Sequence, residues 1–240
     1  MQDFLTNCAN VLQKYGFSYL RGAGTTLLLA LVGTFFGCLI GFAVGALQTI
    51  PIDKQRDPAW KRVLLRILRV VLRCYVELFR GTPMIVQAVF IYYGLLQVFG
   101  IKMGMWTAGF FIVSINTGAY MAETVRGGIV SIDPGQTEGA MAIGMNHWQT
   151  MLHVILPQAL RNMVPALLSQ FVTTIKDTSY LWGAMALQEL MGRGMILMNS
   201  YNSTVQIFAI FGLMALIYFV VCFTLSQIVR AYQRRLKGAQ

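Results

Sequence analysis

Hydrophobic residues run along most of this chain in long blocks, and charged residues gather at the ends of those blocks. A membrane-spanning helix needs about 20 mostly apolar residues. Four stretches without a charged side chain reach that length, over residues 22–52, 81–101, 103–122 and 194–229. A fifth stretch, 165–187, is apolar apart from Lys176 and Asp177. The pattern predicts an all-α membrane protein with five transmembrane helices, of which the helix over 165–187 has the weakest hydropathy.

Composition excludes an ordinary soluble domain, because 56% of the 240 residues are hydrophobic and 12% are charged. The net charge of +10 would suggest nucleic acid on a soluble protein, but in a membrane protein it marks topology, and no nucleic-acid partner is expected. With the N-terminus outside and five spans, the inner segments hold most of the Lys and Arg residues, at 54–73, 126, 161 and 230–237. The distribution predicts a cytoplasmic C-terminus and a single transmembrane domain over residues 1–240.

Two features between residues 33 and 73 concern helix packing. Gly33, Gly37, Gly41 and Gly45 recur every four residues, which places them on one helix face and lets a neighbouring backbone approach closely. Arginines follow at positions 62, 66, 69 and 73, and this spacing predicts a basic amphipathic helix. That helix would lie at the membrane interface against anionic headgroups or dock an acidic partner.

A helix break is predicted at Arg80-Gly81-Thr82-Pro83. Proline disfavours helical geometry at Thr82, and Gly81 permits a sharp bend. Glu77 lies three residues before Arg80, so the two side chains are expected to pair on one helix face just before the break.

A long inner loop follows the span over 103–122 and occupies about residues 123–164. Its centre, residues 138–148, contains helix-forming Ala and Met with an interrupting Gly144, which predicts two short helices joined by a turn. Within it, Glu138-Gly139-Ala140 is followed at fixed offsets by Gly144 and then by Val154-Ile155-Leu156-Pro157. This pattern resembles the EAA loop of ABC-importer permeases, although Gly139 replaces the family's usual alanine and Val154 its usual isoleucine.

The resemblance implies the type I ABC-importer permease fold, in which this loop forms the coupling helix that docks on a cytoplasmic ATPase. Further segments resemble the polar-amino-acid branch of the family, which serves histidine, glutamine, arginine and glutamate. The chain would then be a multi-pass permease subunit of the bacterial cytoplasmic membrane that moves a polar L-amino acid. The residues that carry these likenesses are Glu138, Gly139, Ala140, Gly144, Leu156 and Pro157 for coupling, and 80–83, Gln87, Tyr120, Glu123, Arg126 and 176–179 for the branch.

The partners that the resemblance implies are two copies of the ATPase, a second permease copy or paralogue, and an extracytoplasmic solute-binding protein. The chain itself would bind no cofactor, because ATP and Mg would sit on the ATPase. The sequence agrees with this division, since it contains no Gly-x-x-x-x-Gly-Lys-Ser/Thr phosphate loop. His147 and His153 are six apart rather than four, so no helical zinc site is expected, and no catalytic residue is assigned.

Lys176 and Asp177 are candidates for the substrate path, because charged side chains near a bilayer centre cost about 2.5–3.5 kcal/mol each and usually face a cavity or a partner. Together they offer a donor and an acceptor for a zwitterionic amino acid, and a purely structural network is the alternative. Asn116, Gln170 and Tyr180 are further polar candidates, which serve equally well as bonds between helices.

The alternative function is an amino-acid transporter driven by an ion gradient, with Lys176 and Asp177 as its coupling site. Such transporters usually contain inverted repeats, and five spans do not divide into equal halves. A membrane enzyme or scaffold is a further alternative. The sequence leaves open which amino acid is moved and whether the permease pair is a homodimer or a heterodimer.

Overall fold

The computed structural model describes residues 2–52 and 58–237, and its regular structure within those residues is helical throughout. Positions 54 and 56 of the basic segment lie outside the described residues. Two single π-helical turns, η1 and η2, interrupt the α-helices. The elements are α1 Gln2–Thr49, α2 Ala59–Gly81, α3 Met84–Val89, η1 Phe90–Gly94, α4 Leu95–Phe99, α5 Met105–Val130, α6 Pro134–Ala142, α7 His147–Thr150, η2 Met151–Ile155, α8 Leu156–Asp177, α9 Tyr180–Met185, α10 Leu190–Met198 and α11 Thr204–Lys237.

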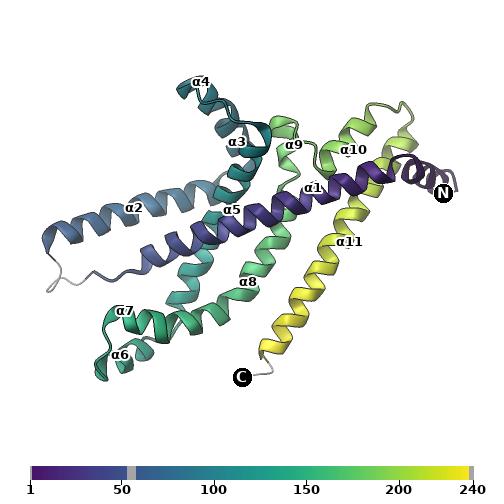
Figure 1. Ribbon diagram of the computed structural model, residues 1–240. Helices are drawn as coiled ribbons and strands as arrows, with labels where there is room; N and C mark the ends of the chain where they lie inside the picture. The colour runs from purple at the N-terminus through teal and green to yellow at the C-terminus, as the bar shows by residue number, and fades with distance from the viewer. Residues whose placement is uncertain (1, 53–57, 238–240) are drawn as a thin grey trace.

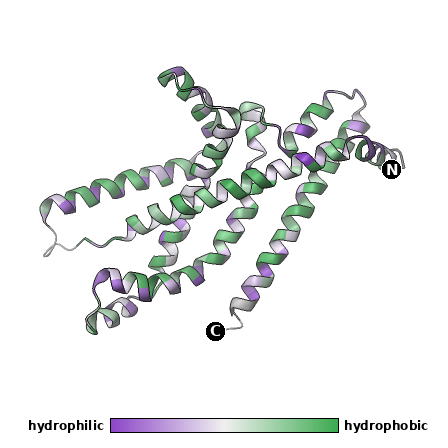
Figure 2. Cartoon of the chain, in the orientation of Figure 1, coloured by the Kyte–Doolittle hydropathy of each residue, from purple (hydrophilic) through white to green (hydrophobic). Residues whose placement is uncertain are grey.

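Two described helices are long and apolar enough to cross a membrane by length and composition, within Phe4–Thr49 and Thr204–Arg234. The pair Ala59–Gly81 and Met84–Phe99 would make a third if it counts as one span, although it is bent by 114°. Hydrophobic residues cover most of α1 and α11, and hydrophilic residues gather near the C-terminal end of α11 (Figure 2).

Several helix limits differ from the apolar stretches. The first helix begins at Gln2, about twenty residues before the stretch 22–52, and the stretch 194–229 is divided because α10 ends at Met198 and α11 begins at Thr204. Pro165 lies inside α8 rather than at its start. The stretch 165–187 breaks after Asp177, where α8 gives way to the short helix α9.

The glycine seam of α1 packs along α5, as its spacing predicts. A methyl group added at Gly37 would lie 2.9 Å from Cβ of Thr117, and one at Gly45 would lie 2.8 Å from the carbonyl oxygen of Ala122. There is therefore no room for a side chain at these positions. The close approach is the packing mode that small residues permit between membrane helices.

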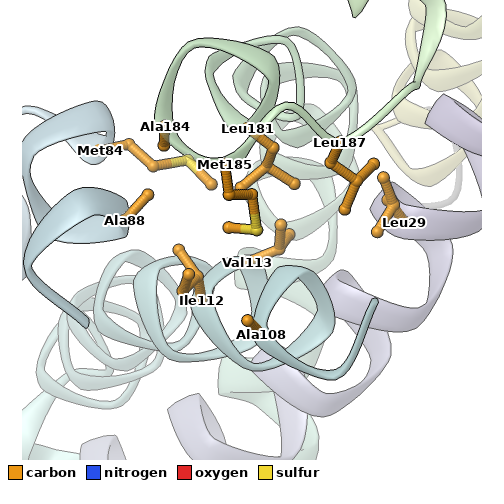
Figure 3. Close-up of a cluster of buried hydrophobic side chains, with 10 residues drawn as sticks. All are labelled: Leu29, Met84, Ala88, Ala108, Ile112, Val113, Leu181, Ala184, Met185 and Leu187. Carbon is orange, nitrogen blue, oxygen red and sulfur yellow. The ribbon is translucent and has the colours of Figure 1, made fainter. Parts of the chain in front are cut away.

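The central core joins α1, α3, α5 and α9 (Figure 3). Met185 of α9 reaches toward Ile112 and Val113 of α5, while Leu187, just after α9, lies beside Leu29 of α1. A second cluster holds the start of α1 against α10 and α11 through Val11, Tyr19, Leu190 and Ile210, with others. The region over residues 8–19, which precedes the first predicted span, therefore belongs to the packed body of the protein.

Glu189 forms a buried polar link beside this second cluster. Its carboxylate accepts hydrogen bonds from the Tyr218 hydroxyl at 2.8 Å, the Thr26 hydroxyl at 3.1 Å and the Gly192 amide at 2.8 Å. Its residue is fully buried, so these donors replace the water that a carboxylate needs. The link ties α1, α10 and α11 together at the end of the molecule where the N-terminus lies (Figure 1).

Candidate functional site

The loop between α5 and α8 is built from two short helices, as predicted, with a glycine turn between them. Asp133 caps α6, because its Oδ1 accepts a hydrogen bond from the Gly135 amide at 2.7 Å, and Pro134 occupies the first turn. Asn146 and Gln149 form a reciprocal capping box that starts α7, with distances of 3.0 and 2.9 Å. Both helices therefore start with a side-chain cap.

Gly144 makes the turn between α6 and α7 possible. Its φ is +90°, a region that glycine enters without steric cost. The Met145 amide donates to the Ala140 carbonyl at 3.1 Å, and the Gly144 amide donates to the Met141 carbonyl at 3.0 Å. These two bonds are the Schellman pattern that closes the C-terminus of a helix.

The tip of the loop exposes large apolar side chains. Ile143 is 80% exposed, Trp148 63% and Met141 46%, whereas Met145 is half-buried. Glu138 and Gly139 are exposed and Ala140 is buried. Sequence reasoning missed Ile143 and Trp148 as exposed apolar residues. Large apolar side chains on either side of the turn at Gly144 could have indicated a contact surface.

The base of the loop is continuous with the helices behind it. Leu156 begins α8 directly after the π-helical turn η2, and Pro157 is the second residue of α8. Ile155 and Ala159 are buried against Val125 and Ile129 of α5. A displacement of α6 and α7 would therefore reach α5 and α8 through packed side chains.

The predicted helix break separates α2 from α3 at Thr82 and Pro83, both of which are extended in backbone geometry. Proline has no amide hydrogen for the Phe79 carbonyl four residues earlier. The side chain of Gln87 replaces it, since its Nε2 lies 2.9 Å from the Phe79 oxygen and 2.8 Å from the Thr82 carbonyl oxygen. The side chain of Gln87 thus supplies hydrogen bonds that the backbone loses at the break.

Asn116 anchors the break to α5. Its Nδ2 donates to Oε1 of Gln87 at 2.8 Å, and the residue is buried. This contact favours the packing role for Asn116 over a role in the substrate path. The next residue of α5 is Thr117, whose hydroxyl oxygen lies 3.3 Å from the hydroxyl oxygen of Thr174 in α8. The Thr174 hydroxyl also donates to the Gln170 carbonyl at 3.0 Å.

Lys176 and Asp177 lie at the junction of α8 and α9. Lys176 is exposed, Asp177 is half-buried and Tyr180 is 46% exposed. Within the described residues, the side chains of Lys176 and Asp177 form neither a hydrogen bond nor an ion pair. The two charges are therefore available to a ligand or to a partner chain.

An ion cluster joins α2 to α5 at the end nearer the loop. Glu123 accepts two hydrogen bonds from Arg126, at 3.0 and 2.5 Å, and lies 4.0 Å from Arg80. Arg80 also lies over the Tyr120 ring, 5.8 Å from its centre. The expected pairing of Glu77 with Arg80 is replaced by this contact with Glu123.

Comparison with known proteins identifies a matching family and several relatives of this chain. Residues 59–238 match the family described as binding-protein-dependent transport system inner membrane component. The glutamine transport system permease protein of Escherichia coli K12 is 34% identical over 219 residues, which cover 91% of this chain and 92% of that protein. The arginine transport system permease protein of Bacillus subtilis is 29% identical over 222 residues, covering 91% and 92%.

Solved structures resemble the whole chain as well. The crystal structure of an amino acid ABC transporter with histidines superposes with a TM-score of 0.80 at 32% identity, covering 93% of this chain and 96% of that one. An inward-facing structure of the MetNI methionine ABC transporter gives a TM-score of 0.68 at 23% identity, covering 91% and 97%. The second likeness concerns the fold alone.

Proposed function

The chain belongs to the family of binding-protein-dependent transport system inner membrane components. We propose below which solute it moves, which residues bind that solute and which residues couple its transport to ATP hydrolysis. It is a permease subunit of an ABC importer for amino acids, with the type I permease fold. ATP is hydrolysed by a separate subunit. These assignments confirm the interpretation drawn from the loop pattern.

The proposed substrate is a polar L-amino acid. Relatives named for glutamine, arginine and cystine transport support this class, as do the unpaired charges of Lys176 and Asp177. A zwitterion brings a carboxylate for the ammonium of Lys176 and an ammonium for the carboxylate of Asp177. Tyr180 and Gln170 lie on the same two helices and are proposed to flank this position, whereas Asn116 is proposed to hold the helix break through Gln87.

The proposed topology has five spans in the bacterial inner membrane, with the N-terminus outside and the C-terminus in the cytoplasm. The spans are α1, the α3–α4 region beyond the bend, α5, the α8–α9 region and α11. Figure 1 supports the orientation, because the N-terminus lies at one end of the molecule, while the C-terminus, α6 and α7 lie toward the other. The basic residues of the segments 61–73 and 230–234 favour the same cytoplasmic side.

Coupling is proposed to run through α6, the Gly144 turn and α7. The exposed side chains of Ile143, Trp148 and Met141 form an apolar knob that would enter a groove on the ATPase, as short amphipathic helices do in other complexes. ATP binding would close a pair of ATPase subunits, each carrying ATP and Mg. The loop would then carry the motion to α5 and α8 of this chain and of a second permease subunit, and a solute-binding protein would deliver substrate at the outer side.

The observation that carries this proposal is the loop itself, in which a glycine-dependent turn presents apolar side chains, while Ile155 of η2 packs against α5 and α8. The test is uptake of glutamine and of arginine by vesicles that contain the chain, its ATPase and its binding protein. Uptake should require ATP on the ATPase side and should persist when ionophores collapse ion gradients. Uptake driven by an ion gradient without ATP would favour the secondary transporter instead.

A further inference from the structure

A polar cavity of about 620 Å³ lies between the end of α1, the arginine-bearing face of α2, the end of α5 and the loop. This volume is within the range of about 300–1,000 Å³ that is usual for small-molecule sites. Its walls come from elements on both sides of the coupling loop, and they carry both guanidinium and hydroxyl groups. The polar residues that line it include Gln48, Arg69, Arg73, Glu77, Arg126 and Thr150.

The faces of α2 explain why arginines line a cavity. Val76 is buried against α1 and α5 in the cluster with Val44 and Ala122, and the opposite face exposes Ile67 and other apolar side chains. Arg69 lies seven residues before Val76, so the arginine stripe runs along the edge of the buried face and away from Ile67. Arginines that flank an apolar outer face point into a polar cavity, the usual solution for charges near a bilayer.

The charges of the cavity do not cancel. Glu123 accepts two hydrogen bonds from Arg126 and also attracts the charge of Arg73. The described lining residues include three arginines but only two glutamates, Glu77 and Glu123. Within the part of the chain that the structure describes, Arg73 forms no hydrogen bond or ion pair. Arg69 donates from Nη2 to the Ile50 carbonyl, but its Nε is buried without a partner.

One further group lacks a partner at the loop side. The hydroxyl of Thr150 is buried and makes no hydrogen bond, although a buried hydroxyl ordinarily has one. It belongs to the last residue of α7, so a ligand held by Arg69 and Arg73 would lie between α2 and the coupling loop.

We propose that this cavity binds a phosphate group through the guanidinium groups of Arg69 and Arg73. These residues are four apart on α2, which places their Cβ atoms about 6 Å from each other on one face. The planar guanidinium matches phosphate oxygens in bidentate geometry. The phosphate comes from the headgroup of an anionic lipid or from free phosphate in the cytoplasm, and in either case it would join α2 to the loop. The site does not depend on the identity of the transported amino acid.

The test measures protection of a thiol in the cavity. Gln48→Cys is introduced into the full chain after its four native cysteines are replaced by serine, and the complex with its ATPase is placed in phosphatidylcholine nanodiscs. The rate of alkylation by a charged maleimide is then measured alone, with inorganic phosphate, and with phosphatidylglycerol added to the lipid. The variants are R69Q/R73Q and the matched control R66Q, which removes one charge from an exposed position of the same helix outside the cavity lining.

We expect about tenfold slower alkylation when the phosphate source is present, with the effect lost in R69Q/R73Q and kept in R66Q, since hydrogen bonds to charged groups change occupancy by about this factor. Protection by phosphatidylglycerol alone identifies a lipid headgroup, and protection by inorganic phosphate identifies the free anion. R69K/R73K keeps the charge and should retain weaker protection, which separates binding from a folding defect. No protection by either source, or equal protection in R69Q/R73Q, overturns the proposal.

Discussion

Gly144 and Gly139 provide a matched pair for testing the coupling turn. Both have open space where a methyl group would go, but only Gly144 has a positive φ, of +90°. Alanine at Gly144 is therefore disfavoured by the backbone alone, by about 1–3 kcal/mol. Because about 1.4 kcal/mol is a factor of ten in an equilibrium, the turn would be populated about tenfold less against relaxed alternatives. Alanine at Gly139 lies within α6 and should stabilise that helix by up to about 1 kcal/mol.

The assay is the number of ATP molecules hydrolysed per amino acid taken up, measured on each complex in proteoliposomes. Gly144→Ala should raise this ratio several-fold while the complex stays assembled, because the knob no longer holds a fixed orientation on the ATPase. Gly139→Ala should leave the ratio unchanged. An unchanged ratio in Gly144→Ala, or equal uncoupling in both variants, would refute the assignment of the turn.

Three further substitutions test the fold and the substrate path. Gln87→Leu leaves the Phe79 carbonyl without its donor, and because each unsatisfied buried group costs about 1–3 kcal/mol, the apparent melting temperature in detergent should fall. An unaltered melting curve would show that Gln87 does not support the helix break. Gly45→Ala forces a methyl group against α5 and should destabilise the protein by about 1–3 kcal/mol, whereas Gly24→Ala, with open space around it, should not; equal melting temperatures would contradict the packing seam. Asp177→Asn should raise the KM for amino-acid uptake about tenfold without releasing the ATPase, and an unchanged KM would remove Asp177 from the path.

The glycine seam and the helix break could be predicted from the sequence because they depend on local residue types. Gly37 and Gly45 indicate close helix contact wherever the partner lies. Gly81 and Pro83 together favour a break, whereas Pro165 alone lies inside α8. The partner helices were not accessible, since nothing local shows that Gly45 meets Ala122. The same limit applies to Arg80, whose sequence neighbour Glu77 was the expected partner, while the folded chain brings Glu123 closer.

Helix limits were predicted less well where hydropathy and helix formation differ. Hydropathy placed the first element at residue 22, but polar residues between Val11 and Tyr19 do not prevent a helix whose apolar positions pack on α11. Conversely, the stretch 194–229 has no charge, yet Asn199 and Ser203 bound a break within it. The cavity beside Arg69 and Arg73 depends on four segments that meet only in three dimensions, so a sequence pattern alone predicts the arginine stripe and not its direction.

A cross-link from the coupling loop to the ATPase in membrane vesicles tests most directly whether α6, the Gly144 turn and α7 dock on the ATPase. Ile143→Cys suits it, because Ile143 is 80% exposed, whereas the side chain of Asn146 caps α7 and should be kept. Ile196→Cys on α10, on the N-terminal side of the molecule, is the control. We expect a cross-link from Ile143→Cys whose yield changes with ATP, and none from Ile196→Cys. Absence of any cross-link from Ile143→Cys and Trp148→Cys would contradict it.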